Sequence, residues 1–219
     1  ASTHVLASYL KTDYFVNWVP EECCNCEMGN IFSTRFRSID LDCIKQSKYI
    51  YNPKTHTEHF LNSSLLDGID YLVIQGGHEF KHKEMLELEF LKQKHIFYSN
   101  LCWVPEITKL VNQVQMSNET HVFGIHFRDY IQQFDENDQR NFAQDSPIEQ
   151  FEIVCNNIIK TYPSAKFYIS SNSKTAASRL SSGLQKHMVY HFAEDVNTSR
   201  NSKDGIIHAV ASLLILSKC

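Results

Sequence analysis

Glycine is scarce in this sequence, with seven residues among 219. Neither the GxGxxG pattern of dinucleotide-binding folds nor the GxxxxGK[ST] pattern of phosphate-binding loops occurs. Both patterns need glycine so that the backbone can approach a phosphate closely. Proteins that rely on either motif are therefore excluded, and any nucleotide bound by this chain must be held by side chains and helix ends.

Long apolar runs are absent as well. No stretch approaches the ~18 consecutive apolar residues of a membrane-spanning helix, and the opening ASTHVLASYLKTDY lacks the basic-then-apolar order of a signal peptide. Positive charge is not in excess either, because the net charge is -4 at pH 7. We therefore expect a soluble chain with no nucleic-acid or membrane partner. The sequence leaves localisation unknown, with the cytoplasm slightly favoured over the lumen of the secretory pathway.

Cysteine is present but lacks the regular framework of a small secreted domain. The seven cysteines are an odd number at irregular spacings, which predicts mostly reduced thiols. The densest group is Cys23, Cys24 and Cys26, whose CCxC order also suggests a zinc site. No second pair of ligands follows at finger-like spacing, so we expect no metal there and an ordinary loop that can hold a local disulfide.

Strand-like and helix-like segments alternate along the chain. Runs rich in β-branched and aromatic residues occupy 14–19, 48–52, 70–75, 121–127, 166–171 and 188–192. Helical patterns lie at 81–94, at 105–116 with proline in the first turn, and from 146 onward. In that last helix we expect Ser146 to cap, Pro147 to occupy the first turn and Glu149 to complete a capping box. The alternation predicts an α/β fold with mainly parallel sheets.

The length suits one sizeable domain or two small ones, and two are preferred. A long helical pattern passes through the polar segment MSNET into the strongest strand pattern, and the boundary is placed there. This gives an amino-terminal lobe at 1–118 and a carboxyl-terminal lobe at 119–219. No internal repeat or long flexible linker separates them, so we expect two compact Rossmann-like lobes with a cleft between them.

The strand pattern VFGIHFRDYI, at 122–131, changes character at its end. Side chains alternate along a strand, so His126 and Arg128 are expected on one side, at the end where parallel sheets bind ligands. An imidazole and a guanidinium together suit a diphosphate, because the guanidinium fork matches phosphate oxygens. The alternative is that His126 and Arg128 form a salt bridge with Asp129 between the lobes.

Four segments of the carboxyl-terminal half resemble, in order and spacing, the donor-binding half of the GT-B fucosyltransferases. The similarity is greatest to the core α1,6-fucosyltransferase group, within a superfamily that includes the protein O-fucosyltransferases. The segments are FGIHFRDY with Glu136 ten positions after His126, the helix start SPIEQF, FYISSNS at 167–173, and NSKDGIIHAVASLLILS at 201–217. In the amino-terminal half, where such enzymes hold the acceptor, LASYLKTDYFVNWVPEECCNCEMGNIF gives weaker support.

This resemblance implies a metal-independent glycosyltransferase without a cofactor. It would move a sugar, fucose foremost, from a nucleotide-diphosphate donor such as GDP-fucose to a glycan or glycoprotein acceptor. Arg128 would grip the β-phosphate and stabilise the leaving nucleotide, and His126 would contact the diphosphate or the ribose. Glu136 would be the general base, with Asp135 and Asp138 as rivals for that role.

Three further positions follow from the same resemblance. Asn172 and Ser173 stand where the family carries two aspartates that recognise the base and the ribose. Ser202 would donate to phosphate together with the free N–H groups at the start of the last helix. The alternative for Ser202 is a plain helix cap, which looks the same in the sequence.

The chain departs from the family at several positions. Asp129 replaces the second arginine of the family's pair, Asn172 and Ser173 replace two aspartates, and Ala209 replaces an acidic residue of the last helix. Losing a directly bound positive charge weakens donor binding by about 1–3 kcal/mol. One alternative is therefore a degenerate transferase fold that binds sugar or protein without catalysis. The other is a metal-dependent transferase that uses Asp40-Leu-Asp42 as a D-x-D motif.

Overall fold

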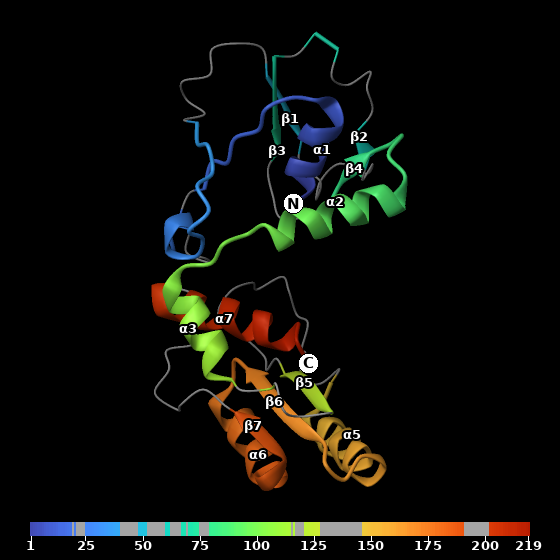
Figure 1. The fold of residues 1–219 in the computed structure, drawn as a ribbon, viewed down its shortest axis with the longest axis vertical. Coiled ribbons are helices and arrows are strands. Elements are labelled where there is room, and N and C mark those ends of the chain that lie inside the picture. The colour runs from blue at the N-terminus through green and yellow to red at the C-terminus, as the bar shows by residue number, and fades with distance from the viewer. Residues whose placement is uncertain are drawn as a thin grey trace. The chain divides into compact units, whose positions relative to one another are not determined.

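The chain folds as an α/β protein made of two compact units (Figure 1). Unit 1 comprises Ala1–Val19 and Phe32–Cys102, and unit 2 comprises Pro20–Ile31 and Trp103–Cys219. The computed structural model describes residues 1–18, 20, 25–39, 48–51, 60–61, 67–68, 70–74, 79–114, 116, 121–127, 146–190 and 202–219. Among those residues, no helix is both long and apolar enough to cross a membrane.

In its described residues, unit 1 combines two helices with two pairs of parallel strands. The helices are α1 (Ser2–Leu10) and α2 (Glu87–Ser99). One strand pair joins β1 (Lys48–Tyr51) to β3 (Tyr71–Ile74), and the other joins β2 (Phe60–Leu61) to β4 (Lys81–His82). The predicted strands at 48–52 and 70–75 therefore exist, and they pair with each other.

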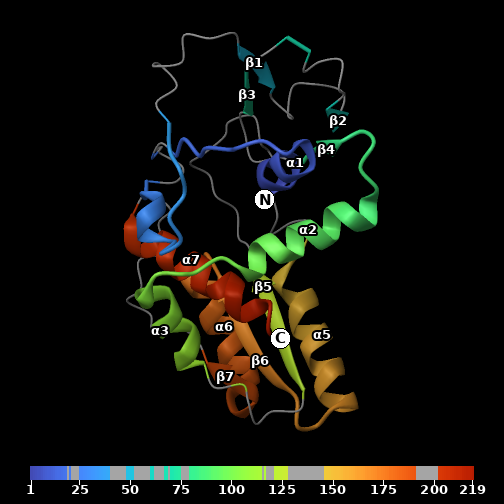
Figure 2. The same cartoon turned by 45° about the horizontal axis from the view of Figure 1, so that its top comes forward.

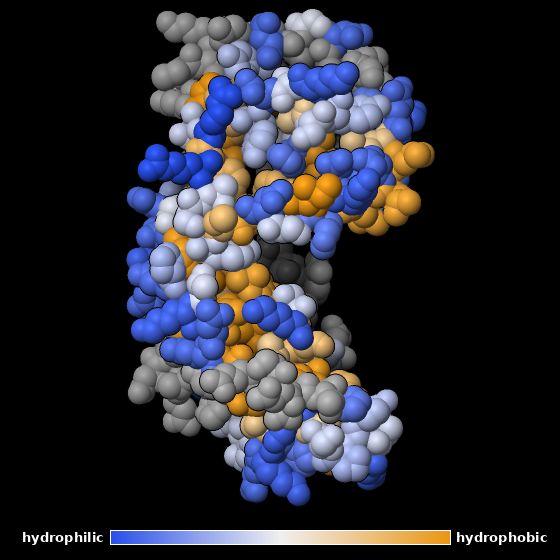
Figure 3. Space-filling model, viewed as in Figure 1, coloured by the Kyte–Doolittle hydropathy of each residue, from blue (hydrophilic) through white to orange (hydrophobic). Residues whose placement is uncertain are grey.

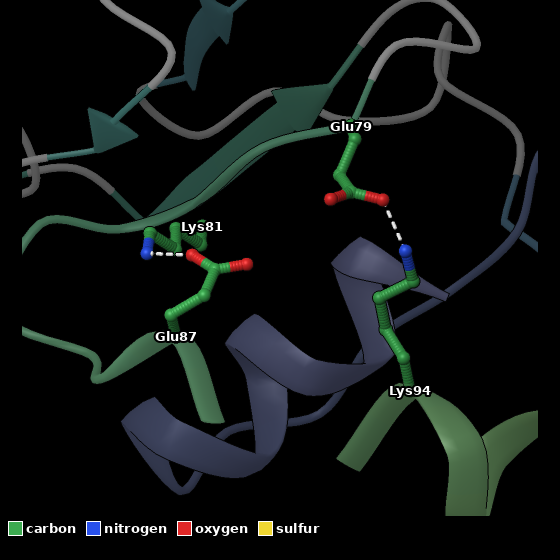
Figure 4. A network of polar contacts seen from close by, with 4 residues as sticks. All are labelled: Glu79, Lys81, Glu87 and Lys94. Carbon is green, nitrogen blue, oxygen red and sulfur yellow. Dashed lines mark hydrogen bonds and ion pairs between the residues drawn. The ribbon is translucent and has the colours of Figure 1, made fainter. Parts of the chain in front are cut away.

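The packing of unit 1 is apolar at its centre and ionic at its surface. Val5 of α1 packs with Met85 and with Phe90 of α2, which is 1% exposed. Outside this cluster, Lys81 pairs with Glu87, and Lys94 pairs with Glu79 (Figure 4). Exposed pairs of this kind contribute at most about 1 kcal/mol each, so the apolar contacts hold α2 in place.

Two expectations for unit 1 are wrong. Residues 14–18 form no strand, although Val16 N–H donates to Arg37 O at 2.8 Å. The helix expected from residue 81 begins at Glu87, because Lys81 and His82 pair with β2 instead. His82 is 1% exposed there, so burial of this side chain accompanies the strand conformation.

Unit 2 is built on a parallel sheet with the strand order β5-β6-β7. The strands are β5 (Val122–Phe127), β6 (Lys166–Ser171) and β7 (Met188–Tyr190). The predicted strand at 166–171 is confirmed to the residue, and the one at 121–127 is confirmed except for its first residue. The prediction at 188–192 is confirmed over Met188–Tyr190, and its last two residues lie outside the described part of the chain. β5 and β6 pair without interruption from Val122 and Lys166 onward, whereas the register between β6 and β7 shifts after Phe167.

Helices cover both faces of this sheet (Figure 2). On one face, Phe127, Phe167 and neighbouring apolar residues pack against α5 (Ile148–Thr161) and α6 (Lys174–Leu184). On the other face lies α7 (Lys203–Leu216), where the buried Tyr168 hydroxyl donates to Ser212 Oγ at 3.1 Å. α3 (Pro105–Gln113) packs on α7 and begins at proline as predicted. Two short 3-10 turns complete the unit, Met28–Asn30 and Gln185–His187.

The predicted capping box of α5 is wrong. Pro147 is the N-cap residue in an extended conformation, so the helix begins one residue later than expected. Glu149 pairs instead with Arg179 of α6 at 2.8 Å, and Glu152 binds the same guanidinium at 2.8 and 2.9 Å. The pKa of Glu149 lies below its ordinary value, because the carboxylate accepts a backbone hydrogen bond and a further one from Arg179. This acidic pair ties α5 to α6.

Candidate functional site

The carboxyl ends of β5 and β6 meet at one edge of the unit 2 sheet. In the parallel register His126 lies opposite Ser170, and Phe127 lies opposite Ser171. His126 is exposed, whereas its neighbour Phe127 is buried against Phe151 of α5. The expected alternation at this strand end is therefore present, and the imidazole emerges on the face that carries Gly124 and α7.

Asn172 and Ser173 lie directly after β6, at the same edge of the sheet. The N–H of Ser173 donates to Ser171 Oγ at 3.0 Å, and Ser173 Oγ accepts from Ala176 N–H at 3.3 Å. Ser173 is thus the N-cap of α6, whose first turn contains no acidic residue and opens with Lys174. A helix start of this composition favours a nearby anion.

Ser202 stands at the start of a different helix, α7. Its Oγ accepts from Gly205 N–H at 3.1 Å, so the geometry of a plain helix cap is present. Asp204 lies in the first turn of this helix. Its carboxylate opposes a phosphate at this helix end, which makes the start of α6 the better anion site of the two.

The remaining predicted site residues lie outside the part of the chain that the structure describes. Of the residues discussed for the diphosphate and general-base roles, these are Arg128, Asp129, Asp135, Glu136 and Asp138. The D-x-D pair Asp40 and Asp42 and the cysteines Cys23 and Cys24 fall outside it as well. The structure therefore brings together His126, Asn172 and Ser173, and no hydrogen bond or ion pair joins His126 to Ser202 within the described residues.

Sequence reasoning overlooked Ser170, Ser171 and Lys174. Ser170 faces His126 across the ladder, Ser171 orders the turn, and Lys174 supplies a cation at the α6 start. The signal was available in the run SSNSK, since small polar residues ending a buried strand are typical of a helix cap and its preceding turn.

A cavity of about 620 Å³ lies beside β5 within unit 2. Its walls come from β5, from α5 and from the end of α7, and they are mostly aliphatic and aromatic. His126 and two thiols, Cys155 and Cys219, are the polar members of the lining. Burial raises the pKa of Cys155, aided by the charge of Glu152, so this thiol is a poor nucleophile.

No cluster of three or more histidine, cysteine or acidic side chains that could hold a metal ion occurs among the described residues. Cys102, Cys155 and Cys219 are free thiols. Apolar atoms reach the surface of unit 2 where α7 runs (Figure 3), and Leu213 of that helix is exposed.

Replacing Ser173 separates helix capping from ligand binding. Ser173→Ala is expected to lower the free energy of unfolding by roughly 0.5–2 kcal/mol, because the Ala176 N–H loses its acceptor. Ser173→Asp is expected to retain stability, since aspartate also caps, but to weaken the binding of a diphosphate through repulsion. Chemical denaturation measures the first effect and calorimetric titration with GDP the second. Equal destabilisation by both variants would contradict the capping role.

No protein-family model matches this chain, and no curated protein matches it either.

Proposed function

We propose that this protein is a metal-independent glycosyltransferase of the GT-B fucosyltransferase type. It would transfer a sugar, fucose foremost, from a nucleotide-diphosphate donor to a glycan or glycoprotein acceptor. Its two units would correspond to two Rossmann-like lobes, with unit 2 as the donor side. Support comes from the parallel sheet of unit 2, which carries helices on both faces.

One observation carries the proposal: three of the expected site residues share one sheet edge. His126 ends β5, and Asn172 and Ser173 follow β6 at the start of α6. In open α/β sheets, ligands bind outside the carboxyl ends of the strands. A helix start beside an imidazole and a lysine suits the negative charge of a diphosphate.

In this proposal the residues divide the chemistry as follows. The Arg128 guanidinium neutralises the charge that develops on the leaving nucleoside diphosphate, in place of a metal ion. His126 holds the diphosphate or the ribose. Glu136 accepts the proton of the attacking acceptor hydroxyl. Asn172 and Ser173 hydrogen-bond to the base and the ribose.

A second candidate is a non-catalytic sugar- or protein-binding module on the same fold. Asp204 in the first turn of α7 favours it, since this carboxylate opposes a phosphate beside Ser202. Asp129 adds a further negative charge close in sequence to Arg128. An interaction module would keep the fold without saturable binding of nucleotides.

Titration with nucleotides tests the proposal directly. GDP, UDP, GDP-fucose and UDP-sugars are added to the protein in two parallel series, one with EDTA and one with a divalent metal ion in place of EDTA, and thermal unfolding is followed. A ligand at 100 times its Kd stabilises the folded form by about 2.7 kcal/mol, so one nucleotide is expected to raise Tm and to do so without metal. No shift with any nucleotide would favour the binding module. A shift that EDTA abolishes would favour the D-x-D enzyme.

A further inference from the structure

The outer edge of β5 is the long side of this strand that faces away from β6, and no described strand pairs with it. Lys166 N–H donates to His121 O at 2.9 Å, which fixes the direction of the ladder. In a parallel strand the N–H and C=O of alternate residues point to opposite edges, so those of Val122, Gly124 and His126 point away from β6. Within the described residues no backbone hydrogen bond reaches these three.

The two edge strands of this sheet, β5 and β7, differ in how well they are protected against pairing with a further strand. Proteins usually blunt a sheet edge with short strands, bulges, lysine or proline. The β7 edge follows this rule, because β7 has three residues and an irregular register with β6. The β5 edge does not, since VFGIHF is six residues long, in regular register, and has neither lysine nor proline.

The cavity beside β5 is a slot with this edge as its floor. Phe151, Val154 and Ile158 of α5 form one wall, and Leu216 and Cys219 form the other. A strand next to its neighbour takes up ~4.8 Å across the sheet, ~10 Å between layers and ~3.3 Å along its axis, or roughly 160 Å³ per residue. The cavity of about 620 Å³ thus has room for a short stretch of one strand.

We propose that this slot binds an extended apolar segment of a partner polypeptide, which adds to the sheet as a strand beside β5. Both walls are apolar, so the segment carries apolar side chains on both faces, as the inner strands of covered sheets do. An alkyl ligand could contact the walls but would leave the backbone groups of the floor unpaired. A second copy of this chain cannot offer its own β5, which is recessed between the same two helices.

The inference does not depend on the proposed transferase activity. The probe is the peptide acetyl-KVIVIK-amide, added to the full chain labelled with ¹⁵N. Amide exchange is measured by NMR at five successive β5 residues. We expect exchange to slow at least about ten-fold at the N–H groups of Val122, Gly124 and His126. The N–H groups of Phe123 and Ile125, which face β6, are expected to change little.

Two N-methylated peptides show whether hydrogen bonds hold the probe. One is methylated at its second and fourth residues and the other at its third and fifth. The N–H groups of only one of these two pairs of peptide residues face β5. Methylation of that pair is therefore expected to abolish binding, and methylation of the other pair is expected to preserve it. Equal binding of both would overturn strand addition in favour of simple filling of an apolar cavity. Failure of the unmethylated peptide to bind at millimolar concentration would overturn the proposal as well.

A matched pair of protein variants completes the test. Val122→Pro removes an outward N–H without breaking the ladder to β6, and proline is tolerated at such edge positions. We expect it to weaken peptide binding several-fold, whereas Val122→Ala keeps the N–H and most of the affinity. Equal affinity of both variants contradicts the proposal.

The oligomeric state gives a further test of what occupies this edge. A concentration-dependent dimer that the peptide does not dissociate would instead assign the edge to a second copy. Nucleotide binding is measured on the same samples, so that a failure of peptide binding can be distinguished from a failure of the transferase proposal.

Discussion

Arg128→Ala is expected to abolish sugar transfer and to weaken nucleotide-diphosphate binding by roughly 10- to 150-fold. The affinity range follows from the loss of one hydrogen-bonded charge contact, which is worth about 1.5–3 kcal/mol. In the proposed mechanism transfer falls further, by at least about 100-fold in kcat, because the guanidinium would stabilise charge that is larger in the transition state than in the ground state. Titration calorimetry with GDP and a turnover assay with GDP-fucose measure the two effects.

Two variants serve as controls for this prediction. Arg128→Lys keeps the charge but loses the bidentate fork, so its affinity and turnover are expected between those of the native protein and Arg128→Ala. Lys186→Ala removes an exposed positive charge just before β7, the strand of the sheet that lies farthest from β5. This substitution is expected to change neither nucleotide affinity nor turnover. Native turnover in Arg128→Ala would remove the main site assignment. A loss of the same size in Lys186→Ala would show that net charge, and not position, matters.

Phe167→Ala is expected to destabilise unit 2 by about 3–5 kcal/mol, which is a large part of the stability of an ordinary domain. Phe167 is 0% exposed, is the second residue of the central strand β6, and packs among the residues that join the sheet to α5 and α6. Its removal costs apolar burial and leaves a cavity that the surrounding elements fill only in part. Trp103 belongs to unit 2, so its fluorescence during denaturation, in a Trp18→Phe background, is the measurement.

Ile153→Ala is the matched control for the core substitution. Ile153 lies on α5 in the same unit but is 51% exposed, so its replacement is expected to change stability by at most about 0.5 kcal/mol. If the two variants shift the denaturation midpoint equally, Phe167 is not at the centre of this core.

The strands of unit 2 could be predicted because their signal is local. In KFYISS, buried residues lie on both faces of the sheet, and in VFGIHF Ile125 and Phe127 are buried on one face. The apolar composition of both segments alone separates them from their polar surroundings. The segment YFVNWV has a similar composition, yet its described residues form no strand. A strand needs a partner, and the only backbone bond described there is the one from Val16 to Arg37. Composition cannot reveal whether a partner exists.

Helix starts were harder to predict, since a cap depends on one residue's backbone. Ser146 and Glu149 have the spacing of a capping box, but Pro147 takes the extended conformation and Glu149 turns to Arg179. The start of α7 was predicted more closely, with Ser202 as its cap. At the candidate site, the orientation of His126 at its strand end follows from alternation, whereas Asn172 and Ser173 were assigned from the resemblance. The diphosphate role of Arg128 rests on its side-chain chemistry as well as on resemblance, whereas the role of Glu136 as general base comes from the resemblance.

The two units are interleaved along the chain, and this limits how either can be produced alone. Unit 2 takes Pro20–Ile31 from the amino-terminal part, and Val104 N–H donates to Ile31 O at 3.1 Å. α3, with its fully buried Ile107, also belongs to unit 2 and packs on α7. An expression fragment that begins at residue 119 would lack both pieces and would expose the flank of α7 to water. A truncation that keeps all of unit 2 has to join 20–31 to 103–219, so unit 2 cannot be expressed as one continuous segment of the chain.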